Sequence, residues 1–128
     1  LAKEIGLSNS ACLRRVNHLE ESGVIDGYTA LLNPKKLNRD LLVYVQGTFF
    51  EEDPALKERF IFEVKLIPQI TECHLMAGSY DFILKMLVSD LDEFHAIKTK
   101  YLTKEIGIKT LKSEVSLKTI KYTTELPL

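Results

Sequence analysis

From residue 41 onward, the apolar residues alternate between the spacing of a strand and the spacing of a helix. Strand-like segments cover residues 41–50, 70–78, 80–88 and 108–122, and helix-like segments cover residues 55–66 and 91–106. The order is therefore strand, helix, strand, strand, helix, strand. A four-stranded antiparallel sheet with two helices on one face satisfies this order. The sequence thus predicts an α+β fold of the ferredoxin-like βαββαβ type for residues 41–128.

Each predicted helix carries one apolar stripe that can cover the sheet. The two stripes consist of Leu56, Phe60, Val64 and Ile67, and of Leu91, Phe94, Ile97 and Tyr101. Asp90 and Glu93 have the spacing of a capping box, which predicts that the second helix begins at residue 91.

Both faces of the first and third predicted strands are mainly apolar. Leu42 and Tyr44 alternate with Leu41, Val43 and Val45 in the first strand, and Ile83 and Leu87 alternate with Phe82, Leu84 and Met86 in the third. Since neither face of these strands suits water, we predict that a second subunit covers the face without helices, so that the domain is at least a homodimer.

Residues 1–33 have the pattern of a helix-turn-helix. Apolar residues at helix spacing precede Gly6, where a left-handed turn forms easily, and Ser8 can cap the helix that follows. The apolar stripe of that second helix consists of Cys12, Val16 and Leu19. This pattern predicts a small DNA-binding domain.

The second helix is expected to end at Gly23, after which Val24 and Ile25 return to the core. A turn at residues 26–27 and a short strand over residues 28–32 complete this part. Residues 34–40 have the composition of a linker. The predicted organisation is residues 1–33 as the helix-turn-helix, residues 34–40 as the linker and residues 41–128 as the ferredoxin-like domain.

The polar side of the second helix has the chemistry of a DNA-reading face. The candidates for DNA contact are Ser8, Asn9, Ser10, Arg14, Arg15 and His18. Arginine can bind guanine bidentately or hold a phosphate, and the six basic and four acidic residues up to residue 39 leave this part positive by two charges. A solvated amphipathic helix shows the same pattern, and Arg15 can instead pair with Glu20. The residue pattern leaves both interpretations open.

Three stretches carry a resemblance to a known family: LAKEIGLS, CLRRVNHLEESGVI with GYTALLNP, and ITECHLMAGSYDFILK. Together they resemble the Lrp/AsnC, or feast/famine, transcriptional regulators over nearly the whole chain. The resemblance implies a winged-helix-like helix-turn-helix that binds double-stranded DNA. It also implies a C-terminal domain that binds an amino-acid effector and forms dimers, which assemble into octamers or other rings of dimers.

One feature departs from that family. Its members begin with a further helix, whereas this chain begins at Leu1, inside the helix before the turn. We therefore expect a truncated DNA-binding domain. The alternative function is a stand-alone amino-acid-sensing module without useful DNA binding.

The effector site is expected at the loop between the second and third strands. Spacing alone is compatible with a plain hairpin turn at Gly78 and Ser79, or with a site where Ser79, backbone N–H groups and Asp81 hold the charged ends of an amino acid. Family members bind their effectors between dimers, at this loop and near one position of the second helix of the ferredoxin-like domain. The resemblance implies the candidates Leu75, Ala77, Gly78, Ser79, Tyr80, Asp81 and Thr103.

Other functions find little support. Cys73 and His74 are neighbours on a predicted strand and so point to opposite faces, which is unsuitable for binding one metal ion. The sequence contains no phosphate-binding loop or nucleophile motif. We therefore predict no metal site, no cofactor and no enzymatic activity. The apolar runs are too short to cross a bilayer, and the chain has only two cysteines. We therefore predict a cytoplasmic protein with no membrane partner.

Overall fold

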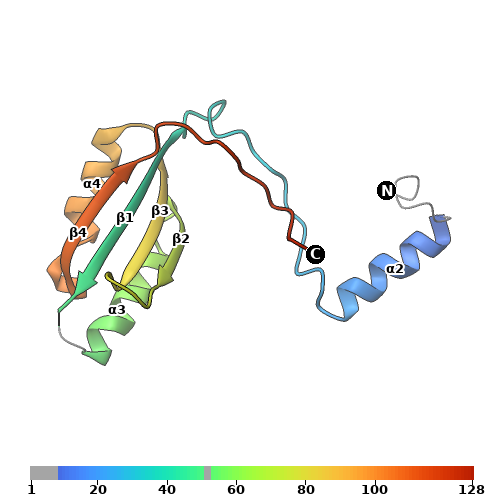
Figure 1. The fold of residues 1–128 in the computed structure, drawn as a ribbon, viewed down its shortest axis with the longest axis horizontal. Coiled ribbons are helices and arrows are strands. Elements are labelled where there is room, and N and C mark those ends of the chain that lie inside the picture. Colours follow the sequence, from blue (N-terminus) through green and yellow to red (C-terminus); the bar gives the residue numbers. More distant parts are fainter. Residues whose placement is uncertain (1–8, 51–52) are drawn as a thin grey trace. The chain divides into compact units, whose positions relative to one another are not determined.

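The computed structural model describes residues 9–50 and 53–128. The chain divides into two compact units, Leu1–Leu32 and Asn33–Leu128, each of which is described by itself (Figure 1). The division places residues 34–40, the expected linker, in the second unit.

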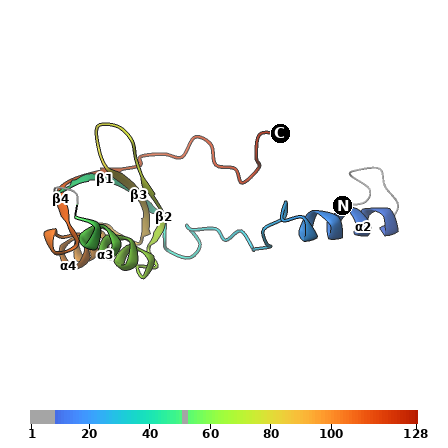
Figure 2. The same ribbon diagram turned by 90° about the horizontal axis from the view of Figure 1, so that it is seen from below.

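The second unit contains a four-stranded sheet with two helices on one face. The strands are β1 (Leu41–Phe49), β2 (Ile70–Leu75), β3 (Phe82–Val88) and β4 (Ile108–Val115), and the helices are α3 (Pro54–Lys65) and α4 (Leu91–Tyr101). The sheet order is β2-β3-β1-β4 with every pairing antiparallel. Both helices lie below the sheet in Figure 2. The predicted ferredoxin-like βαββαβ fold is confirmed.

The core lies between the sheet and the helices. In the central strands every second side chain is buried, as Val43 and Val45 in β1 and Leu84 and Met86 in β3, and the register pairs Val43 with Met86 and Val45 with Leu84. The predicted stripes contribute Phe60, Val64, Phe94 and Ile97 from the helices and Ile67 from just after α3. Two stripe residues lie outside this core: Leu91 is exposed at the start of α4, and Leu56 is only half-buried.

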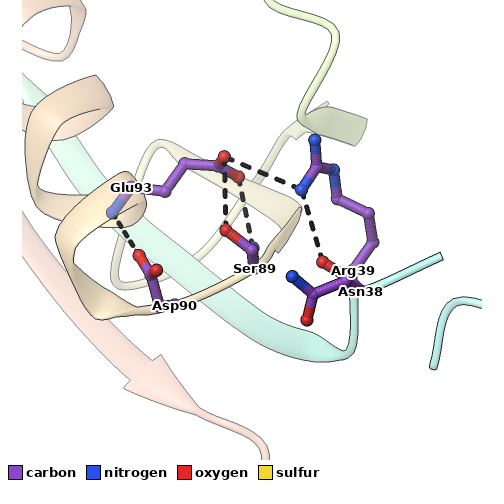
Figure 3. Close-up of polar contacts among 5 residues, drawn as sticks. All are labelled: Asn38, Arg39, Ser89, Asp90 and Glu93. Atoms are coloured by element: carbon purple, nitrogen blue, oxygen red, sulfur yellow. Dashed lines mark hydrogen bonds and ion pairs between the residues drawn. The ribbon is translucent and has the colours of Figure 1, made fainter. Parts of the chain in front are cut away.

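Both helices of this unit begin at an aspartate cap. Asp53 accepts a hydrogen bond from Ala55 N at 3.0 Å, and Asp90 accepts one from Glu93 N at 2.8 Å. The Glu93 carboxylate turns back to Ser89 N at 3.2 Å, one residue before the cap (Figure 3). Its Oε2 also lies 4.0 Å from Nη1 of Arg39, which contacts α4 from the end of the expected linker. The predicted start of α4 is confirmed.

Four predicted elements of this unit are too long. The expected helix over residues 91–106 ends at Tyr101, because Leu102 leaves the helical conformation before a short 3₁₀ turn, η1 (Lys104–Ile106). The expected strand over residues 108–122 ends at Val115, opposite Val43, and Ser116 N makes a last bond to Leu42 O at 2.9 Å. The expected strands over residues 70–78 and 80–88 stop short of residues 76–81, which form a loop.

The first unit contains α2 (Asn9–Glu21). Residues 28–32 lie outside any strand, contrary to the prediction, because no second strand pairs with them. The turn occurs at Ser22 and Gly23 rather than at residues 26–27, and Gly23 has a positive φ of 82°. Val24, expected in the core, is 69% exposed. The predicted helix and turn before residue 9 lie outside the described residues.

The face of the sheet that the two helices leave uncovered, here called the open face, has a mainly apolar centre with charged residues around it. Leu42, Ile83 and Leu87 are half-buried there, and Tyr44 is 40% exposed. Ion pairs join Glu72 in β2 to Lys85 at 3.6 Å and Lys112 to Glu114 in β4 at 3.9 Å, and Lys85 itself lies on β3 between Ile83 and Leu87, opposite Tyr44. The open face is therefore more polar than the strand pattern predicted, with the apolar part confined to β1 and β3.

Candidate DNA-reading helix and effector cavity

The polar face of α2 is fully available to a partner. Cys12 is buried, and Val16 and Leu19 are half-buried, which confirms the predicted stripe. The predicted DNA-contact residues within the described part of the chain are exposed, namely Asn9, Ser10, Arg14, Arg15 and His18. Ser8 lies outside the described residues.

The suggested pairing of Arg15 with Glu20 is absent among the residues that the structure describes. Glu20 instead accepts a hydrogen bond from the Tyr28 hydroxyl at 2.6 Å. This hydrogen bond raises the pKa of the Tyr28 hydroxyl, because it stabilises the protonated form of the hydroxyl. No ion pair between described residues involves Arg14 or Arg15, so both guanidinium groups can meet phosphate or base edges.

The β2–β3 loop projects from the sheet on the side away from the helices (Figure 2). Its two ends are joined by a hydrogen bond from Met76 N to Asp81 O at 2.8 Å. Ala77, Gly78 and Ser79 are exposed, and nothing lies within 4 Å of the place where a Cβ on Gly78 would be. The tip of the loop is therefore accessible rather than packed against this subunit.

Asp81 fastens this loop to the end of β1. Its Oδ2 accepts a hydrogen bond from Phe49 N at 2.8 Å, and its own N–H donates to Gly47 O at 2.8 Å. One carboxylate oxygen is thus committed to the backbone. The expectation that Asp81 serves chiefly as the partner of an effector ammonium is incomplete, because this side chain also holds one wall of a cavity in place.

That cavity lies at the base of the loop and has a volume of about 470 Å³. Its lining consists of Phe49, Phe50, Asp53, Pro54, Leu56, Lys57, Glu58, Leu75, Met76, Asp81, Ile106 and Gly107. Phe50, Leu75 and Met76 are 46%, 49% and 41% exposed, so three large apolar side chains gather at its opening. The charged groups around it are three carboxylates and one ammonium. A cavity that combines apolar side chains with charged groups can hold a small zwitterion with an apolar side chain.

The structure gathers only part of the predicted effector set at this cavity. Leu75 and Asp81 line it, whereas residues 77–80 lie on the loop above it. Thr103 lies outside the lining and outside α4. Its backbone is extended and its Oγ1 caps η1 by accepting from Glu105 N at 3.3 Å. The helix ends before Thr103, which corrects the expectation that this residue projects from the helix.

Sequence reasoning missed several lining residues. Leu56 and Ile106 follow the helical period, and nothing in the period distinguishes a residue that lines a cavity from one in the core. Phe49 and Phe50 did offer a signal. Two successive residues of a strand cannot both face the core, so one of two adjacent phenylalanines had to face elsewhere.

The described residues contain few other side chains that could bind a metal ion or act as a nucleophile. No three His, Cys, Asp or Glu side chains in that part of the chain lie close enough to hold a metal ion. Cys73 faces α3 in a second hollow of about 310 Å³, and burial raises the pKa of its thiol. His74 is exposed on the other face, with its Nε2 3.3 Å from Glu72 Oε1. No helix in residues 9–50 and 53–128 is long and apolar enough to cross a membrane.

Two domain families match this sequence. Residues 45–126 match the Lrp/AsnC ligand-binding domain, and residues 1–26 match a winged helix-turn-helix DNA-binding domain. The leucine-responsive regulatory protein of Haemophilus influenzae is 38% identical over 128 residues, which are 100% of this chain and 77% of that protein. The leucine-responsive regulatory protein of Escherichia coli K12 is 37% identical over 126 residues, with 98% and 77% covered.

Solved structures agree in fold. A transcriptional regulator of Neisseria meningitidis, in complex with L-Met, has a TM-score of 0.92 at 30% identity and covers 98% of this chain and 81% of its own. An AsnC family regulator of Agrobacterium tumefaciens has a TM-score of 0.91 at 35% identity, with 98% and 82% covered. A feast or famine regulatory protein of M. tuberculosis, complexed with L-methionine, reaches 0.80 at 25% identity, with 98% and 82% covered.

The ligand-binding domain alone matches more than half of this chain. The DNA-binding match covers the segment that contains all of α2, and the matched relatives are regulators rather than enzymes. Sequence pattern, fold and relatives therefore lead to one conclusion: this chain belongs to the Lrp/AsnC family of transcriptional regulators.

Proposed function

We propose that this protein is an oligomeric DNA-binding regulator whose promoter affinity changes when an apolar amino acid binds its C-terminal domain. The observation that carries the proposal is the cavity of about 470 Å³, because Met76 and Asp81, the first and last residues of the loop where the effector site was expected, line it. DNA and an effector then act on one protein through linkage, and each must change the affinity for the other by the same factor.

The DNA part rests on the exposed face of α2. We propose that Arg14 reads a base and that Arg15 and His18 contact the backbone or neighbouring bases, with further contacts from Ser8, Asn9 and Ser10. Arg14→Ala is expected to weaken specific binding about 10- to 100-fold, which corresponds to about 1 to 3 kcal/mol. Fluorescence anisotropy on the protein's own promoter measures this effect. An unchanged affinity and an unchanged salt dependence would show that Arg14 faces solvent.

The effector part rests on the lining of the cavity. Phe49, Leu56 and Ile106 offer apolar contact, and the free oxygens of Asp81 and Asp53 can receive an ammonium group. The two relatives solved with methionine favour an effector of this kind. We propose that Ala77, Gly78, Ser79 and Tyr80 meet a neighbouring dimer above the cavity, with Thr103 near this contact.

Assembly follows from the open face of the sheet. Leu42, Tyr44, Ile83 and Leu87 form an apolar centre that a second subunit can cover, and we propose a homodimer that associates into an octamer or another ring. Tyr44→Lys places a charge in that centre and is expected to yield monomer at micromolar concentration, where the wild type stays dimeric or larger. Light scattering distinguishes the two. A wild-type monomer at that concentration would refute this part.

Titration calorimetry with the twenty amino acids tests the whole proposal, followed by DNA binding with and without the amino acid that binds. The expected result is heat from apolar amino acids and a change in promoter affinity of about 5- to 150-fold. Amino-acid binding without any DNA binding would instead establish a stand-alone sensing module.

A further inference from the structure

We infer that Lys35 and Lys36 bind the phosphate backbone of the DNA that α2 reads. The inference rests on the proposed DNA-binding function and adds to it a second contact, outside the helix-turn-helix. Both lysines are exposed, and they lie in the turn over residues 33–39 that precedes β1. This turn belongs to the second compact unit rather than to the unit that contains α2.

The turn is a basic stretch of the chain. Residues 27–39 include three basic residues and no acidic one. Nη1 of Arg39 lies 4.0 Å from Oε2 of Glu93, whereas no ion pair between described residues involves either lysine. Two adjacent ammonium groups are therefore left to the solvent. They suit the phosphates of a DNA backbone, which attract cations whatever the base sequence.

The backbone of the turn is ordered by its own hydrogen bonds. Asn33 Oδ1 accepts one from Lys35 N at 3.0 Å and another from Lys36 N at 3.4 Å. The carbonyl of Pro34 accepts a further bond from Arg39 N at 2.8 Å. Because the turn is already formed, binding a phosphate has to order only the two lysine side chains, which lowers the entropic cost of the contact.

The covalent chain keeps the turn near any DNA that α2 holds. The Tyr28 hydroxyl donates to Glu20 of α2 at 2.6 Å, and Lys35 follows Tyr28 by seven residues. Seven extended residues span at most about 25 Å. This limit holds for every arrangement of the two units. One turn of B-DNA is about 34 Å long, so phosphates that flank a site bound by α2 are within reach of the lysines.

The test measures how salt changes the DNA affinity of the full chain and of the double variant Lys35→Gln/Lys36→Gln. Fluorescence anisotropy is recorded with the protein's own promoter and with an unrelated duplex of the same length. Each lost phosphate contact should lower the slope of log affinity against log salt by about 0.9, hence by about 1.8 for each bound subunit of the double variant. Between about 200 and 50 mM salt, wild type should gain at least about 12-fold more affinity than the variant.

The loss should be the same on both duplexes, because a phosphate contact carries no sequence information. Lys35→Arg/Lys36→Arg keeps both charges and should keep the wild-type slope. The control for position is Lys104→Gln/Lys109→Gln, which removes two exposed charges of the same unit at the other end of β1. The two ends of β1 are about 26 Å apart, since a strand rises about 3.3 Å per residue, so this control should also keep the slope.

All four lysines are exposed, so every variant should unfold at the wild-type temperature in circular dichroism. A wild-type slope in Lys35→Gln/Lys36→Gln, or an equal loss of slope in the control, overturns the inference and leaves the proposed function standing. Loss of slope in the arginine variant also overturns it, because charge would not explain the effect. If wild type binds neither duplex, the proposed DNA binding fails, and the inference with it.

Discussion

The substitution Gly47→Ala tests how closely the backbones of β1 and β4 approach each other at this glycine. Gly47 is buried in β1, and an added Cβ would meet the carbonyl oxygen of Thr110 in β4 and lie 2.7 Å from Cζ of Phe82. Neither neighbour can move freely. Thr110 presents backbone, and the Phe82 ring is packed against Phe49 and Phe60 with centroid separations of 5.2 and 4.8 Å.

The expected magnitude follows from two opposing terms. Overpacking a core position costs about 1 to 3 kcal/mol, and the two fixed neighbours place Gly47 in the upper half of this range. Replacing glycine by alanine also restricts the unfolded chain, which offsets about 0.4 to 1 kcal/mol. The net loss is about 1 to 2 kcal/mol, or about 5 to 15 °C in melting temperature for a unit of this size.

Thermal and urea unfolding of the full chain measure this loss. Gly78→Ala is the matched control, because nothing lies within 4 Å of its added Cβ and its φ is not positive, so it should be as stable as wild type or slightly more so. Equal stability of the two alanine variants would show that β1 and β4 do not approach as closely as described, and the reasoning would fail.

Two further predictions concern the cavity wall and the buried thiol. Asp81→Ala leaves Phe49 N without its acceptor and should cost about 1 kcal/mol in urea unfolding and weaken amino-acid binding, whereas Asp81→Asn, which keeps an acceptor oxygen, should restore most of the stability. If both variants were equally unstable, the hydrogen bond would not explain the loss. Burial raises the pKa of Cys73, so less of its thiolate is present at a given pH. In a Cys12→Ser background, iodoacetamide should therefore modify Cys73 several-fold more slowly than it modifies free cysteine at about pH 8.5. Unfolding in urea should remove this difference, and a reaction midpoint at or below that of free cysteine would contradict the burial.

The order of elements could be predicted because it depends on local periodicity. The stripe at Phe60, Val64 and Ile67 and the alternation through Phe82, Leu84 and Met86 are properties of consecutive residues, and both packed as expected. Cap chemistry is equally local, so Asp90 marked the start of α4 correctly.

The ends of elements were predicted less well, because a partner decides them. Residues 116–122 keep an apolar pattern, yet β4 ends at Val115, opposite Val43. Since β1 begins at Leu41, only two residues beyond that pair, it offers no partner to residues 118–122. Residues 28–32 have strand composition and no partner strand. The helix expected to reach residue 106 breaks at Leu102, where the chain must turn to place β4 beside β1.

By itself the sequence determined the fold class and the polar face of α2, since each depends on residues adjacent along the chain or one helical turn apart, whereas the loop expected to hold the effector site followed from the family resemblance. Only the tertiary structure decided that a cavity lies at the base of that loop and that Leu56 and Gly107 form its far wall. It also showed that the Asp81 carboxylate binds Phe49 N. These contacts join residues far apart in sequence, and no period along the chain specifies which side chains the closed sheet will bring together.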